Sequence, residues 1–320
     1  MINSRTRQLG IAPLVTFRIL FGGLMAWGAL RFMLSGWVER LYGEPRFFFK
    51  YYGFEWAPVP DISGMYALYT LIFLSALGMA LGWRYRLSST LFFLSFTWAE
   101  LTDLTNYLNH YYLVILLAFW MIFLPAHRAF SLDLRRRPHL RRTHVPAWCI
   151  YLLMFQLSVV YFYAGFAKLN PDWLLRAMPL AIWLPERAGM PVLGPLFEWT
   201  WTPHLFSWAG ALYDLSLPFL LLFRRTRPWA YLAVIVFHLL THLLFNIGLF
   251  PFIMITSTLI FFPPEVHRRW LSKIGFRPGG TAHYTFPAVG RKLLAFALPL
   301  YLLFQLLFPL RHYLYPGNVL

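Results

Sequence analysis

Nine apolar runs, separated by short polar segments, constrain the fold of this chain more than any other feature. A helix that crosses a membrane needs about 17–25 mostly apolar residues. The chain has 320 residues, of which 59% are hydrophobic and only 12% charged, whereas soluble domains carry about 25% charged residues. We therefore predict an all-α polytopic membrane protein, a helical bundle whose spans lie at about residues 12–33, 65–83, 87–104, 109–125, 147–168, 205–223, 229–246, 248–263 and 293–310.

The distribution of Lys and Arg predicts the orientation of these spans, because positive residues favour cytoplasmic loops. One alternate set of loops holds 19 Lys and Arg residues, and the opposite set holds six. We therefore expect a cytoplasmic N-terminus and an outer C-terminus, and we expect no nucleic-acid partner despite the net charge of +16. The predicted parts are a cytoplasmic N-terminus at residues 1–11, a transmembrane domain at 12–310 with a basic cytoplasmic loop at 264–292, and an outer C-terminus at 311–320. Two outer segments, 34–64 and 169–204, are expected to be packed caps or re-entrant pieces on the membrane rather than free loops.

Rare polar side chains converge on the outer side of this predicted bundle, although only Lys and Arg counts were used to orient it. They are Asp103, Asn109, His110, Lys168, His238 and His242. Ionisable residues inside a membrane are candidates for function. Lys168 follows the fifth apolar run, where loss of water favours a neutral amine that can act as a base. The alternative is a lysine that reaches toward lipid headgroups.

Other residues also have structural interpretations. Asp103 can cap the turn into the fourth span, and His110 can be an interfacial histidine. His238 and His242 share a helical face, but no second histidine pair accompanies them, so we expect no metal. Asp214 lies inside the sixth span, where helix packing and chemistry are equally good explanations. We expect Arg18 to pair with a carboxylate or to reach headgroups.

Several segments together resemble the vitamin K-dependent gamma-glutamyl carboxylase family. The most specific is Ala164-Gly165-Phe166-Ala167-Lys168-Leu169-Asn170-Pro171-Asp172-Trp173, because this segment carries the family's base lysine. Seven further segments resemble the family in the same order, and the likeness runs from about residue 14 to 270. They are Phe17–Gly22, Tyr69–Gly82, Asn109–Leu113, His144–Trp148, Asp214–Ser216, Phe237-His238 and Phe245–Phe250.

The resemblance implies a reaction. Lys168 would deprotonate a reduced naphthoquinone, either reduced vitamin K or menaquinol, which O2 converts to its epoxide. The strong base formed on the way removes a γ proton from a glutamyl residue, to which CO2 then adds. His110 would orient or protonate the oxygenated intermediate. The resemblance implies supporting roles for Asp103, Asn109 and Asp214, and quinone contacts from His238, His242, Phe245, Phe166 and Trp173.

The chain also departs from the animal carboxylases. It ends soon after the ninth run, so we expect it to lack their large lumenal domain. A glutamate-containing peptide or protein would then be the substrate, with a partner protein in place of that domain as an open alternative. The short length resembles bacterial or archaeal members of the wider HTTM group, which predicts a bacterial inner membrane with the site facing outward. Two alternatives stay open: an enzyme acting on a lipid or isoprenoid without carboxylation, and a non-enzymatic scaffold or transporter.

Overall fold

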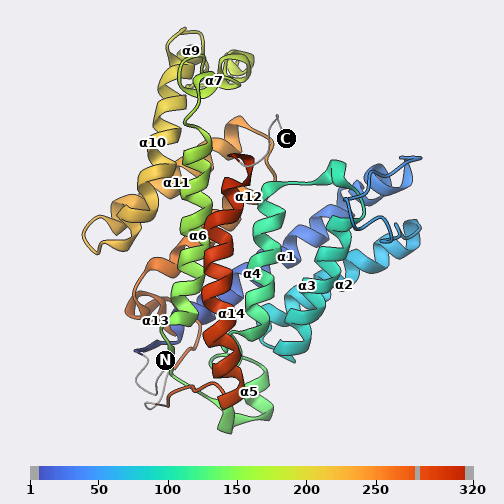
Figure 1. The fold of residues 1–320 in the computed structure, drawn as a ribbon, viewed down its shortest axis with the longest axis vertical. Helices are drawn as coiled ribbons and strands as arrows, with labels where there is room; N and C mark the ends of the chain where they lie inside the picture. The colour runs from blue at the N-terminus through green and yellow to red at the C-terminus, as the bar shows by residue number, and fades with distance from the viewer. Residues whose placement is uncertain (1–6, 278–281, 314–320) are drawn as a thin grey trace. The chain divides into compact units, whose positions relative to one another are not determined.

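The computed structural model describes residues 7–277 and 282–313 and is mostly helical, at 71%. The helices are labelled along the chain in Figure 1. The chain divides into two compact units. We call the first the N-terminal unit; it runs to Tyr151 and includes Phe252–Thr285. The second, the C-terminal unit, contains Leu152–Pro251 and the chain from Phe286 onward. Each unit is described by itself.

Each predicted apolar run corresponds to a helix, with ends within about three residues of the prediction, except for differences of five at the end of the eighth run and at the start of the last. The helices are α1 (Ala12–Leu34), α2 (Ile62–Leu81), α3 (Tyr85–Leu101), α4 (Asn109–Phe123), α6 (Trp148–Ala167), α10 (Thr202–Leu222), α11 (Arg227–Leu244), α12 (Phe250–Thr258) and α14 (Ala288–Leu307). In the part of the chain that is described, six of them (α1, α2, α6, α10, α11 and α14) are long and apolar enough to cross a membrane. The three shorter helices have 17, 15 and 9 residues. Nine spans, and their orientation, therefore stay a prediction.

The N-terminal unit is a run of neighbouring helices in which α1 packs on α2, α2 on α3, and α3 on α4. The tightest approach is at Gly22 on α1, where a Cβ atom would lie 2.8 Å from the backbone nitrogen of Ala80 and 2.9 Å from the carbonyl oxygen of Ala76. Real Cβ atoms do not come so close to backbone atoms. Gly22 therefore sets the separation of α1 and α2.

Two short strands pair just before the start of α1. Strands β1 (Gln8–Gly10) and β2 (His144–Pro146) pair antiparallel, a minor exception to the all-α prediction. The predicted loop 264–292 includes the helix α13 (Pro264–Ser272), which packs against α1, and the start of α14. His267 of α13 is buried, and its Nε2 lies 3.0 Å from the carbonyl oxygen of Leu259.

Arg18 of α1 corrects an expectation, because it is buried and forms no ion pair with a carboxylate among the described residues. Its side chain is buried, and Nη1 donates to the carbonyl oxygens of Ala126 and Ala129 at 3.1 and 3.4 Å, while Nη2 donates to that of Phe130. The chain between α4 and the short helix α5 (Asp133–Arg136) wraps around the guanidinium. A planar group with five donors suits such a set of carbonyl acceptors.

Residues 169–204, which the sequence predicts to be packed on the outer side, form a packed segment of the C-terminal unit that we call the cap. Three short helices, α7 (Pro171–Leu174), α8 (Leu180–Trp183) and α9 (Gly194–Phe197), fold over the start of α10 and contact it. A buried apolar cluster holds them together and joins them to the end of α11; it consists of Leu180, Leu184, Phe197 and Leu244. The cap is thus a packed piece with its own core rather than a free loop.

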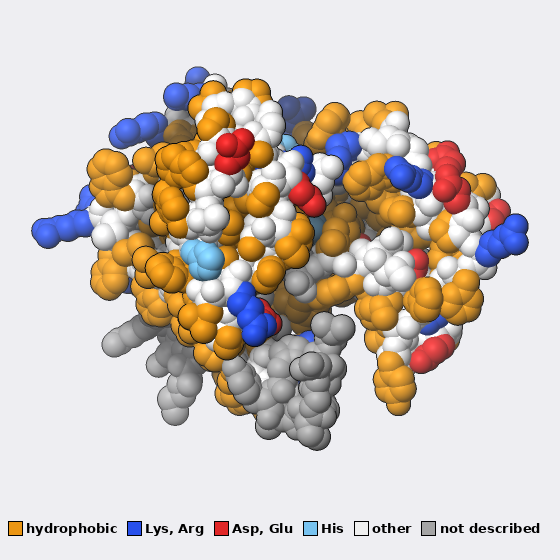
Figure 2. Space-filling model, turned by 90° about the horizontal axis from the view of Figure 1, so that it is seen from above, with side chains coloured by type: hydrophobic (Ala, Val, Ile, Leu, Met, Phe, Trp, Pro, Cys, Tyr) orange, Lys and Arg blue, Asp and Glu red, His pale blue; other side chains and the backbone are white. Residues whose placement is uncertain are grey.

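Large apolar side chains remain exposed along the helices. On α14, Val289, Leu293 and Phe296 are examples, and Figure 2 shows hydrophobic side chains over much of the face that it presents. Soluble monomers rarely expose so much contiguous apolar surface. These side chains fit contact with lipid, as an integral membrane protein requires.

Gly22→Ala should destabilise the N-terminal unit, because the added methyl group collides with the backbone of α2. We expect a cost of about 1–3 kcal/mol, as for other overpacked cores. Gly23→Ala is the matched control, since a Cβ atom there meets nothing within 4 Å. Thermal unfolding in detergent compares the two variants. A Gly22→Ala protein as stable as Gly23→Ala would contradict the tight crossing.

Acid should weaken the packing of α13, because burial lowers the pKa of His267 from 6.5 to about 4. The unfolded chain takes up this proton near the higher pKa and the folded chain only near the lower one. The stability contributed by His267 is therefore complete above pH 6.5 and is lost as the pH falls toward about 4, by up to about 1.4 kcal/mol per pH unit. The measurement is the difference in Tm between wild type and His267→Asn, which should narrow in acid. A Tm difference that does not change with pH would contradict this prediction.

Candidate functional site

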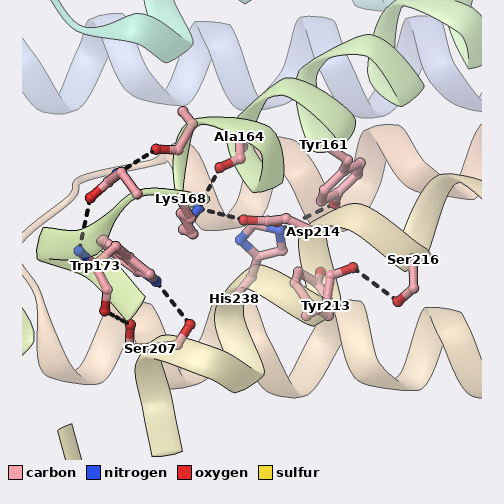
Figure 3. Close-up of polar contacts among 11 residues, drawn as sticks. Tyr161, Ala164, Lys168, Trp173, Ser207, Tyr213, Asp214, Ser216 and His238 are labelled. Atoms are coloured by element: carbon pink, nitrogen blue, oxygen red, sulfur yellow. Dashed lines mark hydrogen bonds and ion pairs between the residues drawn. The ribbon is translucent and has the colours of Figure 1, made fainter. Parts of the chain in front are cut away.

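Lys168 and Asp214 form a buried ion pair in the C-terminal unit. Lys168 follows the last residue of α6, and its Nζ lies 2.6 Å from Oδ2 of Asp214 on α10. The same Nζ donates to the carbonyl oxygen of Ala164 at 3.0 Å. The two side chains are 19% and 6% exposed, respectively. Figure 3 shows the amine turned toward the carboxylate. The structure thus brings together two residues that the sequence singled out from separate spans.

A glycine allows α6 and α10 to approach closely enough for this pair. At Gly165 a Cβ atom would lie 2.7 Å from both the backbone nitrogen and the Cγ of Leu215, which is next to Asp214. Any larger residue would push the helices apart at the position where the short Nζ–Oδ2 contact forms. The Ala-Gly step of the sequence motif therefore has a packing role.

Trp173 of α7 covers the lysine. Its ring centroid lies 5.2 Å from Nζ of Lys168, within reach of a cation–π interaction. Asn170 caps α7 by accepting the backbone N–H of Trp173 at 2.9 Å. The indole Nε1 donates to the carbonyl oxygen of Ser207 on α10 at 2.8 Å, and the Ser207 hydroxyl donates to the carbonyl of Trp173. This indole is therefore fixed over the pair by bonds to the same helix that carries Asp214 (Figure 3).

An aromatic cluster with a histidine adjoins the pair. The hydroxyl of Tyr161 lies 3.2 Å from Nε2 of His238, which is only 2% exposed. Tyr213 stacks on Phe237 with centroids 4.1 Å apart and meets Tyr161 edge to face. The Nδ1 atom of His238 is buried and has no hydrogen-bond partner in the described chain, which is costly for a polar atom.

The pair and the cluster share two helices. Tyr161 precedes Lys168 by seven residues, which is two helical turns and hence the same face of α6. Tyr213 is the neighbour of Asp214 on α10. The ion pair and two of the aromatic side chains therefore lie on α6 and α10, while Phe237 and His238 come from α11.

Three residues implied as quinone contacts lie elsewhere in the C-terminal unit. Phe166 stacks on Phe162 of α6 with centroids 6.4 Å apart. Phe245 follows the last residue of α11, meets Trp183 edge to face and packs on the apolar cluster of the cap, as Trp173 also does. His242 follows His238 by one turn and is exposed. Of the five residues, His238 and Trp173 have contacts that place them at the pair or its cluster.

Asp103, Asn109 and His110 belong to the N-terminal unit. Asp103 is buried and caps the turn Leu104–Asn106, accepting from the N–H and the hydroxyl of Thr105 at 3.1 and 2.8 Å. It also accepts the N–H of Phe49 at 3.1 Å, so it ties segment 34–64 to the end of α3. This is the capping role that the sequence left open.

Asn109 and His110 begin α4, in the same unit. Asn109 is exposed, and the His110 ring lies edge to face with Tyr111 at 4.6 Å. Because His110 and Lys168 are in different units, their shared site stays a prediction. Among the residues that the structure describes, no three His, Cys, Asp or Glu side chains gather where they could hold a metal ion.

Sequence reasoning missed four residues of this site: Tyr161, Gly165, Ser207 and Tyr213. A spacing signal was present, because Tyr161, Gly165 and Lys168 recur at helical intervals along one face. Ser207 carried no such signal, since it contacts Trp173 through its backbone carbonyl and a small hydroxyl that every serine has.

The fold and site define an integral membrane protein with a buried lysine–aspartate pair under an aromatic cover. The HTTM domain model matches residues 6–266. The chain therefore belongs to the HTTM domain family, and HTTM is the membrane domain of vitamin K-dependent carboxylase-like proteins. No solved structure matches the chain.

Lys168 and Asp214 should be energetically coupled. Removing one partner leaves the other charge in apolar surroundings, whereas removing both does not. A double-mutant cycle with Lys168→Met and Asp214→Leu should therefore give a coupling of about 1–3 kcal/mol in the free energy of unfolding, measured in detergent.

The control cycle uses Arg176 and Asp172, which form an ion pair at 2.9 Å with side chains 72% and 68% exposed. Its coupling should stay below about 0.5 kcal/mol, because water screens exposed charges. Equal coupling in the two cycles would show that Lys168–Asp214 is not a buried pair.

Proposed function

We propose that this chain is a membrane enzyme in which Lys168 and Asp214 accept the proton of a reduced naphthoquinone during its epoxidation by O2. Family membership supports the choice of reaction, since HTTM is the membrane domain of vitamin K-dependent carboxylase-like proteins. The observation that carries the proposal is the 2.6 Å contact between Nζ of Lys168 and Oδ2 of Asp214 in a largely buried setting.

The pair can act as a base in either of its proton arrangements. With the proton on nitrogen, the Asp214 carboxylate is the acceptor; with the proton on oxygen, the neutral Lys168 amine is. In both cases the pair takes up one proton and becomes an ammonium beside a carboxylic acid. The sequence predicted a lone neutral lysine, and the paired carboxylate adds a second acceptor within hydrogen-bond reach.

The residues around the pair fit a quinol ring. Tyr161, Tyr213 and Phe237 supply aromatic surface for an apolar ring and its prenyl tail. The unpartnered Nδ1 of His238 is a buried polar atom that a quinol hydroxyl or carbonyl would satisfy. Trp173 shields Lys168 from water, which a strongly basic reaction requires.

When bound, reduced vitamin K or menaquinol supplies the electrons: one quinol and one O2 give one epoxide and one water. Coupled to this, a glutamyl residue of a peptide or protein would lose its γ proton and gain CO2. His110, supported by Asn109, would act on the oxygenated side of this reaction. We place the site at the outer face of a bacterial inner membrane, with a partner protein as a further element where the substrate needs one.

Epoxide formation tests the proposal. Purified protein in nanodiscs receives reduced vitamin K or menaquinol, O2 and bicarbonate, and chromatography measures the quinone epoxide. Wild type should form epoxide, and Lys168→Ala and Asp214→Asn should lower the rate by about 100-fold or more, the usual loss when a general base is removed.

Lys273→Ala is the matched control, because this exposed lysine lies at the end of α13 in the N-terminal unit. It should keep the wild-type rate. Folded wild type that forms no epoxide with either quinol, or a Lys168→Ala protein as active as Lys273→Ala, would refute the proposal. The HTTM fold would then serve lipid or isoprenoid chemistry, or a scaffold.

A further inference from the structure

The N-terminal unit contains a cavity of about 560 Å³ that the proposed reaction does not use. It lies among the second turn of α1, the end of α2, the segment around α5 and residues 274–277. Five arginines line it: Arg18, Arg135, Arg141, Arg142 and Arg277. No Asp or Glu is among the described lining residues. The described lining of the cavity is therefore strongly positive.

The nearest acidic residue in the sequence is already engaged. Asp133 begins α5, and its two carboxylate oxygens accept the backbone N–H groups of Arg84 and Tyr85 at 2.7 and 3.0 Å, capping α3. In the described part of the chain, none of the five cavity arginines forms an ion pair. Their charges are thus available to an anion from outside the chain.

Arg18 gives the cavity a fixed, buried charge. Carbonyl oxygens hold its Nη atoms, and its buried Nε has no partner in the described chain. Gly82 makes room for it: this residue has a φ of 63°, and a Cβ atom there would lie 2.6 Å from Nη1 of Arg18 and 2.4 Å from Cβ of Ser131. Arg135, Arg141 and Arg277 are exposed and stand at the opening.

The opening also carries apolar side chains. Leu81 at the end of α2 and Ile274 after α13 line the cavity and are exposed. This edge of the unit joins helix ends to the loops that the arginine count predicts to be cytoplasmic. A ligand with an anionic head and an apolar tail matches both kinds of surface.

We propose that this cavity binds a phosphate group. The apolar opening favours the headgroup of an anionic phospholipid as its source, and a free phosphate compound shares the same chemistry. Guanidinium groups pair with phosphate oxygens in a planar, two-pronged geometry, and the volume suffices for a glycerophosphate head. This site is independent of the Lys168–Asp214 pair.

Lipid titration of delipidated protein in detergent tests the proposal by native mass spectrometry. Wild type should bind phosphatidylglycerol about tenfold more tightly than phosphatidylcholine. The double variant Arg135→Gln/Arg141→Gln should lose this preference. The double variant Arg136→Gln/Arg137→Gln removes the same charge from exposed neighbours that do not line the cavity, and it should keep the preference.

A second arm separates the two sources of phosphate. Inorganic phosphate and pyrophosphate are added to protein in phosphatidylcholine nanodiscs, and Tm is measured. A rise in Tm that only the Arg135/Arg141 variant loses would assign the cavity to a free phosphate compound. The proposal fails if neither lipid preference nor a rise in Tm is seen. It also fails if both double variants lose binding equally, since general surface charge would then explain the result.

Discussion

The packing of α6, α10 and Trp173 in the C-terminal unit centres on the contact between Lys168 and Asp214. Two ionisable groups in apolar surroundings must meet, and they can meet only where α6 and α10 approach within the space that Gly165 leaves. The indole of Trp173 then covers the amine and is tied by Ser207 to the helix that carries the carboxylate. Packing, capping and charge pairing thus converge on one pair, which is the arrangement that proton transfer needs.

The two units each bury one cation, and they hold it differently. Arg18 is held by backbone carbonyl oxygens, which neither accept its proton nor cancel its charge. Lys168 is held by a carboxylate, with which it can exchange a proton. A guanidinium that stays charged suits anion binding, and an amine beside an acid suits acid–base chemistry. The chemistry of the side chain and its partner is therefore the basis for proposing anion binding at Arg18 and proton transfer at Lys168.

Hydropathy predicted the helices well, because burial in lipid demands long apolar runs whatever their partners are. The sequence also singled out Lys168, which follows the fifth apolar run, and Asp214, which lies inside the sixth. Their pairing could not be read from the sequence, since it depends on how closely two helices pack at Gly165. Arg18 was predicted to pair with a carboxylate or to reach headgroups, whereas the chain after α4 supplies carbonyl oxygens as its hydrogen-bond acceptors. The sequence left open whether Asp103 caps a turn or takes part in chemistry. In the structure it caps the turn Leu104–Asn106.

The most direct test of this account is the environment of the Lys168 amine in a bilayer. The chain has only four lysines, Lys50, Lys168, Lys273 and Lys292. Solid-state NMR of protein labelled with ¹⁵N-lysine and ¹³C-aspartate can therefore resolve the Nζ signal that disappears in Lys168→Ala. We predict that this signal shows dipolar coupling to a carboxylate carbon and that Asp214→Asn abolishes it. A Lys168 signal without carboxylate coupling, typical of a lysine among lipid headgroups, would contradict the buried pair and the proton transfer built on it.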